Sequence, residues 1–376
     1  MGFHLSLNWV SAFTVPMAGI GMMLSADAAL AQSPSAAAIY ESSHTIETGV
    51  KGVTTFPAPP AGFNPLSASA EQRAVYGLPP QPDPVADVAH YRKWARAMAA
   101  PAKRATTPLK ITNLQNGAMK ATGQHPAGPV GATTSVGSYN WSGVVNTISN
   151  LSNWSSTQSI YYVVSEFNVP VAQQAFGGVC DGGWDLEASW NGIDGFSNGD
   201  VLQGGTLSGA YCSGGTTATD YFAWVEWYPS YNIIGVFSVN PGDEMFVETW
   251  DTSSTNGYVY IADLTQGTHG TYRLKPTMPP YLVGNSAEFI VERPCCITGT
   301  NLYPLANYVQ DSWTDDSADT FGGAHLYPGS TSVSTYKVTM YNDNGTQAIS
   351  WPSEIVGNSQ IILEDENCAY SGGCKP

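Results

Sequence analysis

Two glutamates interrupt an otherwise apolar run, Ala287–Glu292, which reads Ala-Glu-Phe-Ile-Val-Glu. Side chains alternate along a strand, so Glu288 and Glu292 lie on the same face. Glutamate is uncommon in strands and costly to bury, so we expect this face to line a cleft. A carboxyl in partly apolar surroundings has a raised pKa and can exchange protons in acid, which suits a general base or acid.

A side-chain amide stands in a second strand-like run, Val201–Gly205, where Gln203 precedes two glycines. We expect the strand to end there and the glycines to allow close approach of another chain segment. The amide N–H donors stay neutral at any pH, so Gln203 could orient a water molecule and stabilise an oxyanion. Combined with a carboxyl, such an amide can hydrolyse a bond through activated water, without a covalent intermediate.

Two further segments place aromatic and acidic side chains on one strand face. In Tyr221–Pro229, Trp224 and Glu226 share a face, and Trp190 shares a face with Asp194. Each segment alone is typical of ordinary strand packing with a polar rim. Together they would bring a carboxyl, an amide and aromatic walls into one groove.

Other catalytic signatures are absent or lack their structural context. The sequence contains no Asp-Thr-Gly or Asp-Ser-Gly, so a pepsin-like aspartic site is not supported. Residues 195–199 match G-x-S-x-G, but no helix is expected after them, as that motif requires. There is no C-x-x-C pair and no H-E-x-x-H, so we expect no metal ion and no cofactor.

Charge is distributed unevenly along the 376 residues, which include 14 basic and 30 acidic residues. Nine basic and six acidic residues precede residue 138, which leaves 14 − 9 = 5 basic and 30 − 6 = 24 acidic residues after it. A chain this acidic repels phosphate, so we expect no nucleic-acid partner. The asymmetry indicates two parts that attract each other.

The first 137 residues differ from the rest. Residues 1–31 predict a signal peptide, because an apolar stretch leads to small residues at Ala29–Ala31, so we expect a secreted, extracellular protein that leaves the membrane after signal removal. Residues 32–137 predict a basic propeptide, with a helix over Pro84–Ala100 and then a Gly-, Ala-, Pro- and Thr-rich linker open to proteolysis. We expect propeptide cleavage between Gly123 and Ser138.

Residues 138–376 predict an all-β catalytic domain. Tyr336–Met340 alternates between apolar and polar residues, and so, in part, do Ser159–Val169, Glu244–Trp250 and Tyr258–Asp263. Turn residues separate such runs about every ten residues, which predicts an antiparallel β-sandwich of two packed sheets. The six cysteines all lie in this part, and their even number in a secreted chain predicts disulfides of undetermined pairing. We expect a monomer.

Five motifs resemble, in order and spacing, those of the glutamic peptidases, also called eqolisins, which are pepstatin-insensitive acid endopeptidases first known from fungi. They are Asn140-Trp141-Ser142-Gly143, Trp190 to Gly195, Leu202-Gln203-x-Gly205, Ala223 to Pro229, and Ala287 to Glu292. The resemblance extends from about Tyr139 to at least Tyr308. Arg293 and Pro294 follow the last motif, at positions where fungal members have acidic residues. In this respect the chain is similar to bacterial members.

The resemblance implies a two-sheet sandwich, a secretory proenzyme and a Gln/Glu catalytic dyad. Carried over by motif, the dyad is Gln203 and Glu292. Supporting side chains would hold the dyad and wall the groove: Trp141, Trp190, Asp194, Trp224, Glu226 and Glu288. The partners would be protein or peptide substrates, and the chain's own propeptide would act as an intramolecular inhibitor.

The charge balance predicts a dependence on pH. Crowded carboxyls have raised pKa values in the folded state, so the domain should tolerate acid and lose stability toward neutral pH. Residues 32–137 hold nine basic and five acidic residues, a balance of +4. We expect this segment to be attracted to the acidic domain near neutral pH and to be released in acid.

Two other classes of function fit parts of the pattern. A β-sandwich glycoside hydrolase could use Glu226 and Glu292 as its carboxyl pair, with aromatic residues stacking on sugars. Gln203 would then have no required role. A non-catalytic, lectin-like binding module would treat Glu292 as structural and would leave the basic extension unexplained.

Overall fold

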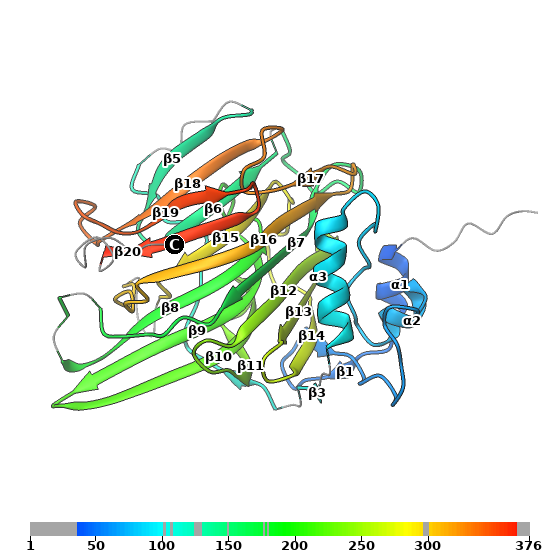
Figure 1. Cartoon of the computed structure of the whole chain (residues 1–376), viewed down its shortest axis with the longest axis horizontal. Helices are drawn as coiled ribbons and strands as arrows, with labels where there is room; N and C mark the ends of the chain where they lie inside the picture. Colours follow the sequence, from blue (N-terminus) through cyan, green and yellow to red (C-terminus); the bar gives the residue numbers. More distant parts are fainter. Residues whose placement is uncertain are drawn as a thin grey trace, which may run out of the picture. The chain divides into compact units, whose positions relative to one another are not determined.

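Two β-sheets, called sheet A and sheet B below, form the body of the described fold (Figure 1). The computed structural model describes residues 36–100, 103–105, 108–123, 130–148, 150–175, 177–178, 180–295 and 301–366. The expected signal peptide, residues 1–31, lies outside the described residues. Within the described part, no helix is both long enough and apolar enough to cross a membrane.

Sheet A is antiparallel except at one short edge strand. Its spatial order is β1 (Ile46–Glu47), β2 (Val53–Thr55), β14 (Thr268–Leu274), β13 (Asn256–Asp263), β12 (Glu244–Ser253), β7 (Ile160–Asn168), β16 (Gln310–Thr320) and β17 (His325–Leu326). The edge strand β3 (Lys103–Arg104) pairs in parallel with the start of β14.

Sheet B carries all five sequence motifs. Its spatial order is β4 (Lys110–Ile111), β11 (Ile234–Ser238), β10 (Thr216–Tyr228), β9 (Val201–Ser213), β8 (Asp181–Ile193), β15 (Ser286–Glu292), β6 (Trp141–Thr147) and β18 (Ser334–Tyr341). Beyond these, β5 (Thr133–Ser138) runs parallel to β18, and β19 (Ala348–Val356) and β20 (Gln360–Asp365) lead from the end of β18 to β16. The expected sandwich of two largely antiparallel sheets is confirmed.

Strand β16 joins the two sheets. Its first residues, Gln310–Trp313, pair with β20 in sheet B, and Thr314–Thr320 pair with β7 in sheet A. The inward faces of the sheets form one buried apolar cluster, because alternate residues of each strand are apolar. Each fully buried aliphatic or aromatic side chain contributes about 1.5–3 kcal/mol to this core.

The glycines after Gln203 lie inside a strand. Strand β9 continues through Gly204 and Gly205 to Ser213, so the expectation that the strand ends at the glycines was wrong. The expected close approach is present, because a Cβ at Gly204 would lie 2.4 Å from a methyl carbon of Val259 in sheet A. Glycine therefore lets β9 and the opposite sheet pack closely at this point.

An N-terminal layer, residues 36–105, covers the outer face of sheet A. Helices α1 (Ala36–Ser42), α2 (Ala70–Val75) and α3 (Val88–Ala99) lie on one side of the sheet (Figure 1). Aromatic side chains from both parts form the contact, with Tyr40 packing against Trp250 and Tyr258 at ring separations of 5.6 and 5.5 Å. The N-terminal layer is therefore packed against the sandwich rather than solvated.

Helix α3 begins four residues later than the sequence predicted. The Asp87 side chain accepts the N–H of His90 and caps the helix. Before it, the Asp83 side chain accepts the N–H groups of Val85 and Ala86, which forms a turn there instead of helix.

Basic side chains of α3 face carboxyls of sheet A. Lys93 pairs with Glu166 and with Asp315 (2.6 Å), and Arg96 pairs with Glu166 and with Glu244 (2.8 Å). These contacts agree with the attraction expected between the basic front and the acidic back of the chain.

One buried histidine of α3 modifies the expected effect of acid. His90 lies 3.3 Å from Asp87 and 3.2 Å from Glu248. Burial alone would lower the pKa of His90, but hydrogen bonds with these two carboxyls raise it to about 9. Burial also raises the pKa of Glu248. Protonation of His90 therefore favours the docked layer as pH falls from about 9 to about 6.5, which runs against the expected release in acid. In stronger acid Asp87 acts the other way, because, against the opposing effect of burial, its interactions with His90 lower its pKa.

The described residues after the N-terminal layer are ordered, unlike the expected open linker; residues 124–129 of the expected cleavage window lie outside the described residues. Residues 112–121, called the strap below, cross the outer face of sheet B, and Asn116 is fully buried. Strand β5 then adds residues 133–138 to the sheet. The sandwich therefore begins before the expected boundary at Ser138.

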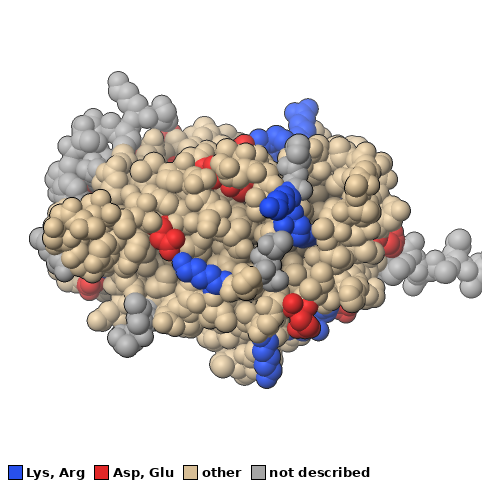
Figure 2. Space-filling model, turned by 90° about the horizontal axis from the view of Figure 1, so that it is seen from below, with Lys and Arg blue, Asp and Glu red and all other residues tan. Residues whose placement is uncertain are grey.

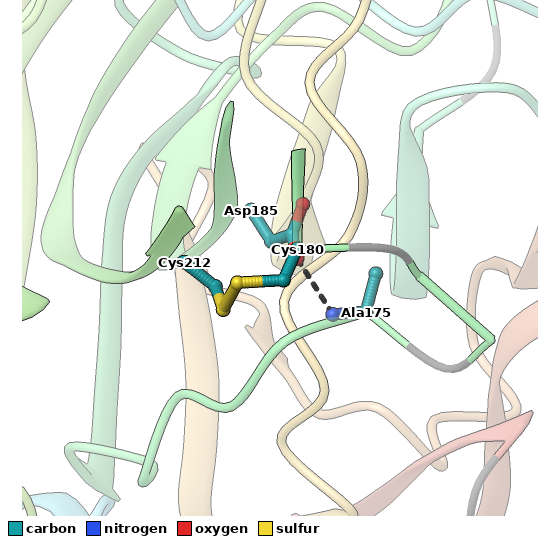
Figure 3. The surroundings of a disulfide bond; sticks show 4 residues. All are labelled: Ala175, Cys180, Asp185 and Cys212. Atoms are coloured by element: carbon teal, nitrogen blue, oxygen red, sulfur yellow. Dashed lines mark hydrogen bonds between the residues drawn. A yellow bond between two sulfur atoms is a disulfide. The ribbon is translucent and has the colours of Figure 1, made fainter. Parts of the chain in front are cut away.

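A disulfide joins the two ends of the β8–β9 hairpin. Cys180, just before β8, is bonded to Cys212 in β9, and the nearby Asp185 side chain accepts the N–H of Ala175 at 2.7 Å (Figure 3). Cys295 is also disulfide-bonded. The expected use of disulfides is confirmed for these cysteines.

If the N-terminal layer belongs to the fold, Trp94→Ala will lower the free energy of unfolding of the full chain by about 3–5 kcal/mol, because it empties a fully buried site in α3. Urea unfolding measures the effect. Val85→Ala, at an 85% exposed position in the same layer, is the control and should change little. An unchanged unfolding midpoint for Trp94→Ala would mean that the layer does not contribute to the cooperative fold.

Candidate active site

Polar side chains form a row across four neighbouring strands of sheet B. Glu288 in β15 pairs with Gly192 in β8. Gly192 in turn pairs with Gln203 in β9, and Gln203 pairs with Glu226 in β10. Directly opposed residues of antiparallel strands place their side chains on the same face. Glu292 lies four residues further along β15 and therefore shares that face.

The strap lies over this row. The side-chain amide of Gln203 donates to the carbonyl oxygen of Asn116 at 3.2 Å. The N–H of Asn116 donates to Glu226 at 3.0 Å, and the N–H of Gly117 donates to Glu292 at 3.0 Å. Gln203, Glu226 and Glu292 thus contact consecutive backbone groups of one short segment.

Glu292 has three neutral hydrogen-bond donors. Besides the Gly117 N–H, the Asn140 side-chain amide donates at 2.8 Å and the Trp190 indole donates at 3.1 Å. Burial raises the pKa of Glu292 to about 8, against the opposing effects of the Gly117 and Asn140 hydrogen bonds. With the strap in place, Glu292 therefore accepts and releases a proton near neutral pH.

Gln203 and Glu226 form the other half of the site. The Gln203 amide also donates to Glu226 at 3.3 Å. Burial raises the pKa of Glu226 well above its ordinary value, and the nearby Glu292 raises it further, while the Asn116 N–H lowers it. The environment of Glu226 therefore favours its neutral form, and its hydrogen bond helps to hold the Gln203 amide in place.

The three tryptophans expected at the site are all fully buried beneath the strap region. Trp190 contacts Glu292 directly, as described above. Trp141 donates its indole N–H to the Gly117 carbonyl at 3.0 Å and packs edge-on against Trp190, with ring centres 5.1 Å apart. Trp224 lies in the same buried apolar cluster. The indole groups thus line the face that the strap covers.

Two of the expected supporting acids are positioned differently. Asp194 accepts the backbone N–H groups of residues 283–285 and so anchors the turn that leads into β15. It supports Glu292 indirectly, through the position of that strand. Glu288 lies in the same row as Gln203 but makes no hydrogen bond to the described strap residues, and burial raises its pKa well above the ordinary value.

Sequence reasoning assigned no role to two parts of this site. Asn140 stood in the first motif and precedes Trp141, which pairs with Glu292 across the β6–β15 ladder, so its place beside Glu292 could have been inferred from strand pairing. The strap residues Asn116 and Gly117 carried no such signal, because they lie in a segment whose composition is typical of a linker.

A separate cluster in the contact between α3 and sheet A has metal-ligand character. Asp87, Asp319 and His325 place one ligand atom each within 4.8 Å of one another. His325 lies 2.7 Å from Asp319 and 3.6 Å from Asp87, and His90 also pairs with Asp87. Ion pairs account for this cluster, and it lies on sheet A rather than at the site on sheet B.

Comparison with known proteins identifies the family. A model of the Peptidase A4 family matches residues 139–363, which is more than half of the chain. The chain belongs to the Peptidase A4 family. The resemblance drawn from the five motifs is thereby confirmed, and Gln203, Glu226 and Glu292 all lie within the matched residues. The N-terminal layer and the strap precede the match.

Individual relatives in this family are distant. Aspergillopepsin-2 of Aspergillus niger is 30% identical over 148 residues, which are 39% of this chain and 50% of the relative. The chain thus spans about half the length of this curated relative. A crystal structure of Scytalido-glutamic peptidase with a peptide-based transition state analog has 21% identity and a TM-score of 0.43, covering 60% of this chain and 98% of that chain. Aspergilloglutamic peptidase from Aspergillus niger has 24% identity and a TM-score of 0.39, covering 48% and 99%.

Many carboxyls of this A4 family member are buried. At least fifteen Asp and Glu residues in the described part are buried, and the face in Figure 2 shows only scattered acidic side chains. Burial, the largest cause in each case, raises the pKa values of Glu187, Asp200 and Glu292 to about 8, of Asp311 to about 7 and of Asp263 to about 6. The folded chain therefore holds protons that the unfolded chain releases.

We expect the melting temperature to fall as pH rises from about 4 to about 8. A carboxyl with a raised pKa contributes full stability below its unfolded value near 4, and that contribution is lost as pH rises through its folded value. Calorimetry of the full chain across this range measures the slope. Glu187→Gln removes one such buried group and should flatten the slope, whereas Glu354→Gln, at an exposed position, should not. A melting temperature that rises over this range contradicts the account.

Proposed function

We propose that this chain is the precursor of a secreted acid endopeptidase that hydrolyses protein substrates with Gln203, Glu292 and an activated water. The observation that carries the proposal is the pair of contacts to one peptide unit. Gln203 donates to the carbonyl oxygen of Asn116, and Glu292 accepts the N–H of Gly117. Family membership and the aspergillopepsin-2 relative support the same activity.

In the proposed mechanism, Glu292 acts first as a base and then as an acid. It removes a proton from water as the water attacks the substrate carbonyl carbon. The Gln203 amide donates to the oxygen on which negative charge develops. Glu292 then gives its proton to the leaving nitrogen as the C–N bond breaks, so no acyl-enzyme forms.

The pKa of Glu292 is compatible with acid activity once the groove is open. Burial is the largest cause of its value of about 8, and the strap is part of what buries it. Without the strap, water reaches the carboxyl and its pKa falls toward the ordinary value. The Asn140 and Trp190 donors remain and favour the ionised form.

The precursor is proposed to be self-inhibited. The strap makes hydrogen bonds with both members of the dyad, and Asn116 of the strap is fully buried there. A substrate therefore cannot make the same contacts while the strap is bound. This agrees with the expectation that the propeptide is an intramolecular inhibitor. The N-terminal layer contacts sheet A, so inhibition depends on the strap and not on the layer itself.

We expect acid-treated protein to digest a denatured protein substrate at about pH 3–4 in the presence of pepstatin, where Glu292 exchanges protons. Glu292→Gln should reduce the initial rate by about 100- to 10,000-fold. Gln203→Ala should reduce it by about 100- to 1,000-fold. Peptide release measured by chromatography gives the rates, and the exposed Glu354→Gln is the matched control.

Gln203→Ala separates the proposal from the glycoside hydrolase alternative, which gives that residue no required role. Full proteolysis by Gln203→Ala would reject the dyad. Absence of proteolysis by correctly processed wild-type protein would reject the peptidase assignment altogether.

A further inference from the structure

The strap is held on sheet B as an extended peptide, with its Asn116–Gly117 bond over the dyad. Before this bond, the Ile233 N–H donates to the Leu114 carbonyl at 2.9 Å, and Gln115 exchanges two backbone hydrogen bonds with Cys295 at 2.8 and 2.9 Å. This is the pattern of an added antiparallel strand, in which the backbone of the bound segment supplies the affinity.

The residues after the bond are held equally well. The Gly117 carbonyl accepts from the Trp141 indole, and the N–H of Met119 donates to the Gly195 carbonyl at 3.0 Å. The N–H of Lys120 donates to the Asn140 side chain at 2.7 Å. Hydrogen bonds on both sides of the Asn116–Gly117 bond therefore fix the register of the strap, so that this bond stays beside the dyad.

Unpaired polar atoms belong to Asn116 and to the two side chains that contact its backbone. The side-chain oxygen of Gln203, one carboxyl oxygen of Glu226 and both polar side-chain atoms of Asn116 are buried and have no hydrogen-bond partner among the described residues. Buried polar atoms of this kind are costly and usually have a partner. These atoms therefore retain hydrogen-bonding capacity that a water molecule at the site would use.

We propose that the Asn116–Gly117 peptide bond is the site at which the enzyme cleaves its own chain, and that the strap marks the register in which peptide substrates bind. This inference rests on the function proposed above. It places the cut before the window between Gly123 and Ser138 that the sequence suggested.

The cleavage is a hydrolysis with water as the only co-reactant. Water adds to the carbonyl carbon of Asn116 and transfers a proton to Glu292, while Gln203 stabilises the oxygen. Glu292 then protonates the Gly117 nitrogen, and the C–N bond breaks. The products are a carboxyl group at Asn116 and an amino group at Gly117.

The register also defines the substrate class. Leu114, Ala118 and Met119 pack against the buried apolar cluster on the outer face of sheet B. They stand at the third position before the bond and at the second and third positions after it. Substrates with apolar side chains at these three positions fit the same contacts.

The test is to hold purified full-length precursor at about pH 4 and at about pH 8, because with the strap in place Glu292 ionises only near its pKa of about 8, and to identify new chain ends by mass spectrometry and N-terminal sequencing. We expect paired ends at Asn116 and Gly117 as the first products, and no fragments from Glu292→Gln. Because the bond is already bound to its own dyad, the first-order rate constant should not change on about tenfold dilution. Digestion of an added denatured protein is assayed in parallel.

Three variants make the result specific. Gly117→Pro removes the N–H that Glu292 accepts, so the Gly117 end should be lost. Gly117→Ala should still be cut, because its Cβ would lie 3.6 Å from the Tyr228 ring, an ordinary contact. Gly123→Pro, where a Cβ meets no atom within 4 Å, lies in the sequence-suggested window and should leave the first cut unchanged.

The outcomes separate the two proposals. Digestion of the added substrate with first processing at another bond, or unchanged first processing in Gly117→Pro, overturns the assignment of the cleavage site and leaves the peptidase function standing. No digestion of either the precursor or the added substrate overturns both.

Discussion

The site of this protein depends on two carboxyls of sheet B that are buried without a basic hydrogen-bond partner. Glu226 and Glu292 lie on the outer face of sheet B and are fully buried. Their hydrogen bonds come from amide, indole and backbone N–H groups. Neutral donors keep these acids in place without fixing their charge, whereas a lysine or arginine would hold them ionised. The absence of a basic partner makes these two carboxyls costly to bury, and it also allows them to exchange protons.

The strap and the N-terminal layer cover different sheets of the sandwich and contact different groups there. The layer covers aromatic side chains on sheet A and brings basic side chains to its carboxyls. The strap supplies backbone N–H groups to the buried acids of sheet B. Protonation of His90 favours the docked layer, and acid also favours the strap-bound state, in which burial raises the pKa of Glu292, so protonation alone releases neither the layer nor the strap.

The sequence predicted the sandwich and the residues of the site better than it predicted what covers them. Alternation along Ala287–Glu292 placed Glu288 and Glu292 on one face, and strand pairing then brought Gln203 and Glu226 to that face. Local pattern could not locate the strap, because its position depends on contacts with residues more than a hundred positions away, such as Gly117 with Glu292. For the same reason, a segment of linker composition became a buried part of the site.

Hydrogen exchange at the Gly117 amide tests the central claim most directly, namely that the dyad holds the strap as a bound peptide. The uncleavable Glu292→Gln precursor is suitable, because its side-chain oxygen still accepts the Gly117 N–H. The account predicts strong protection of the Gly117 amide, with fast exchange at the exposed Gly123. Exchange at Gly117 as fast as at Gly123 would show that the strap does not occupy the site, and would contradict the account.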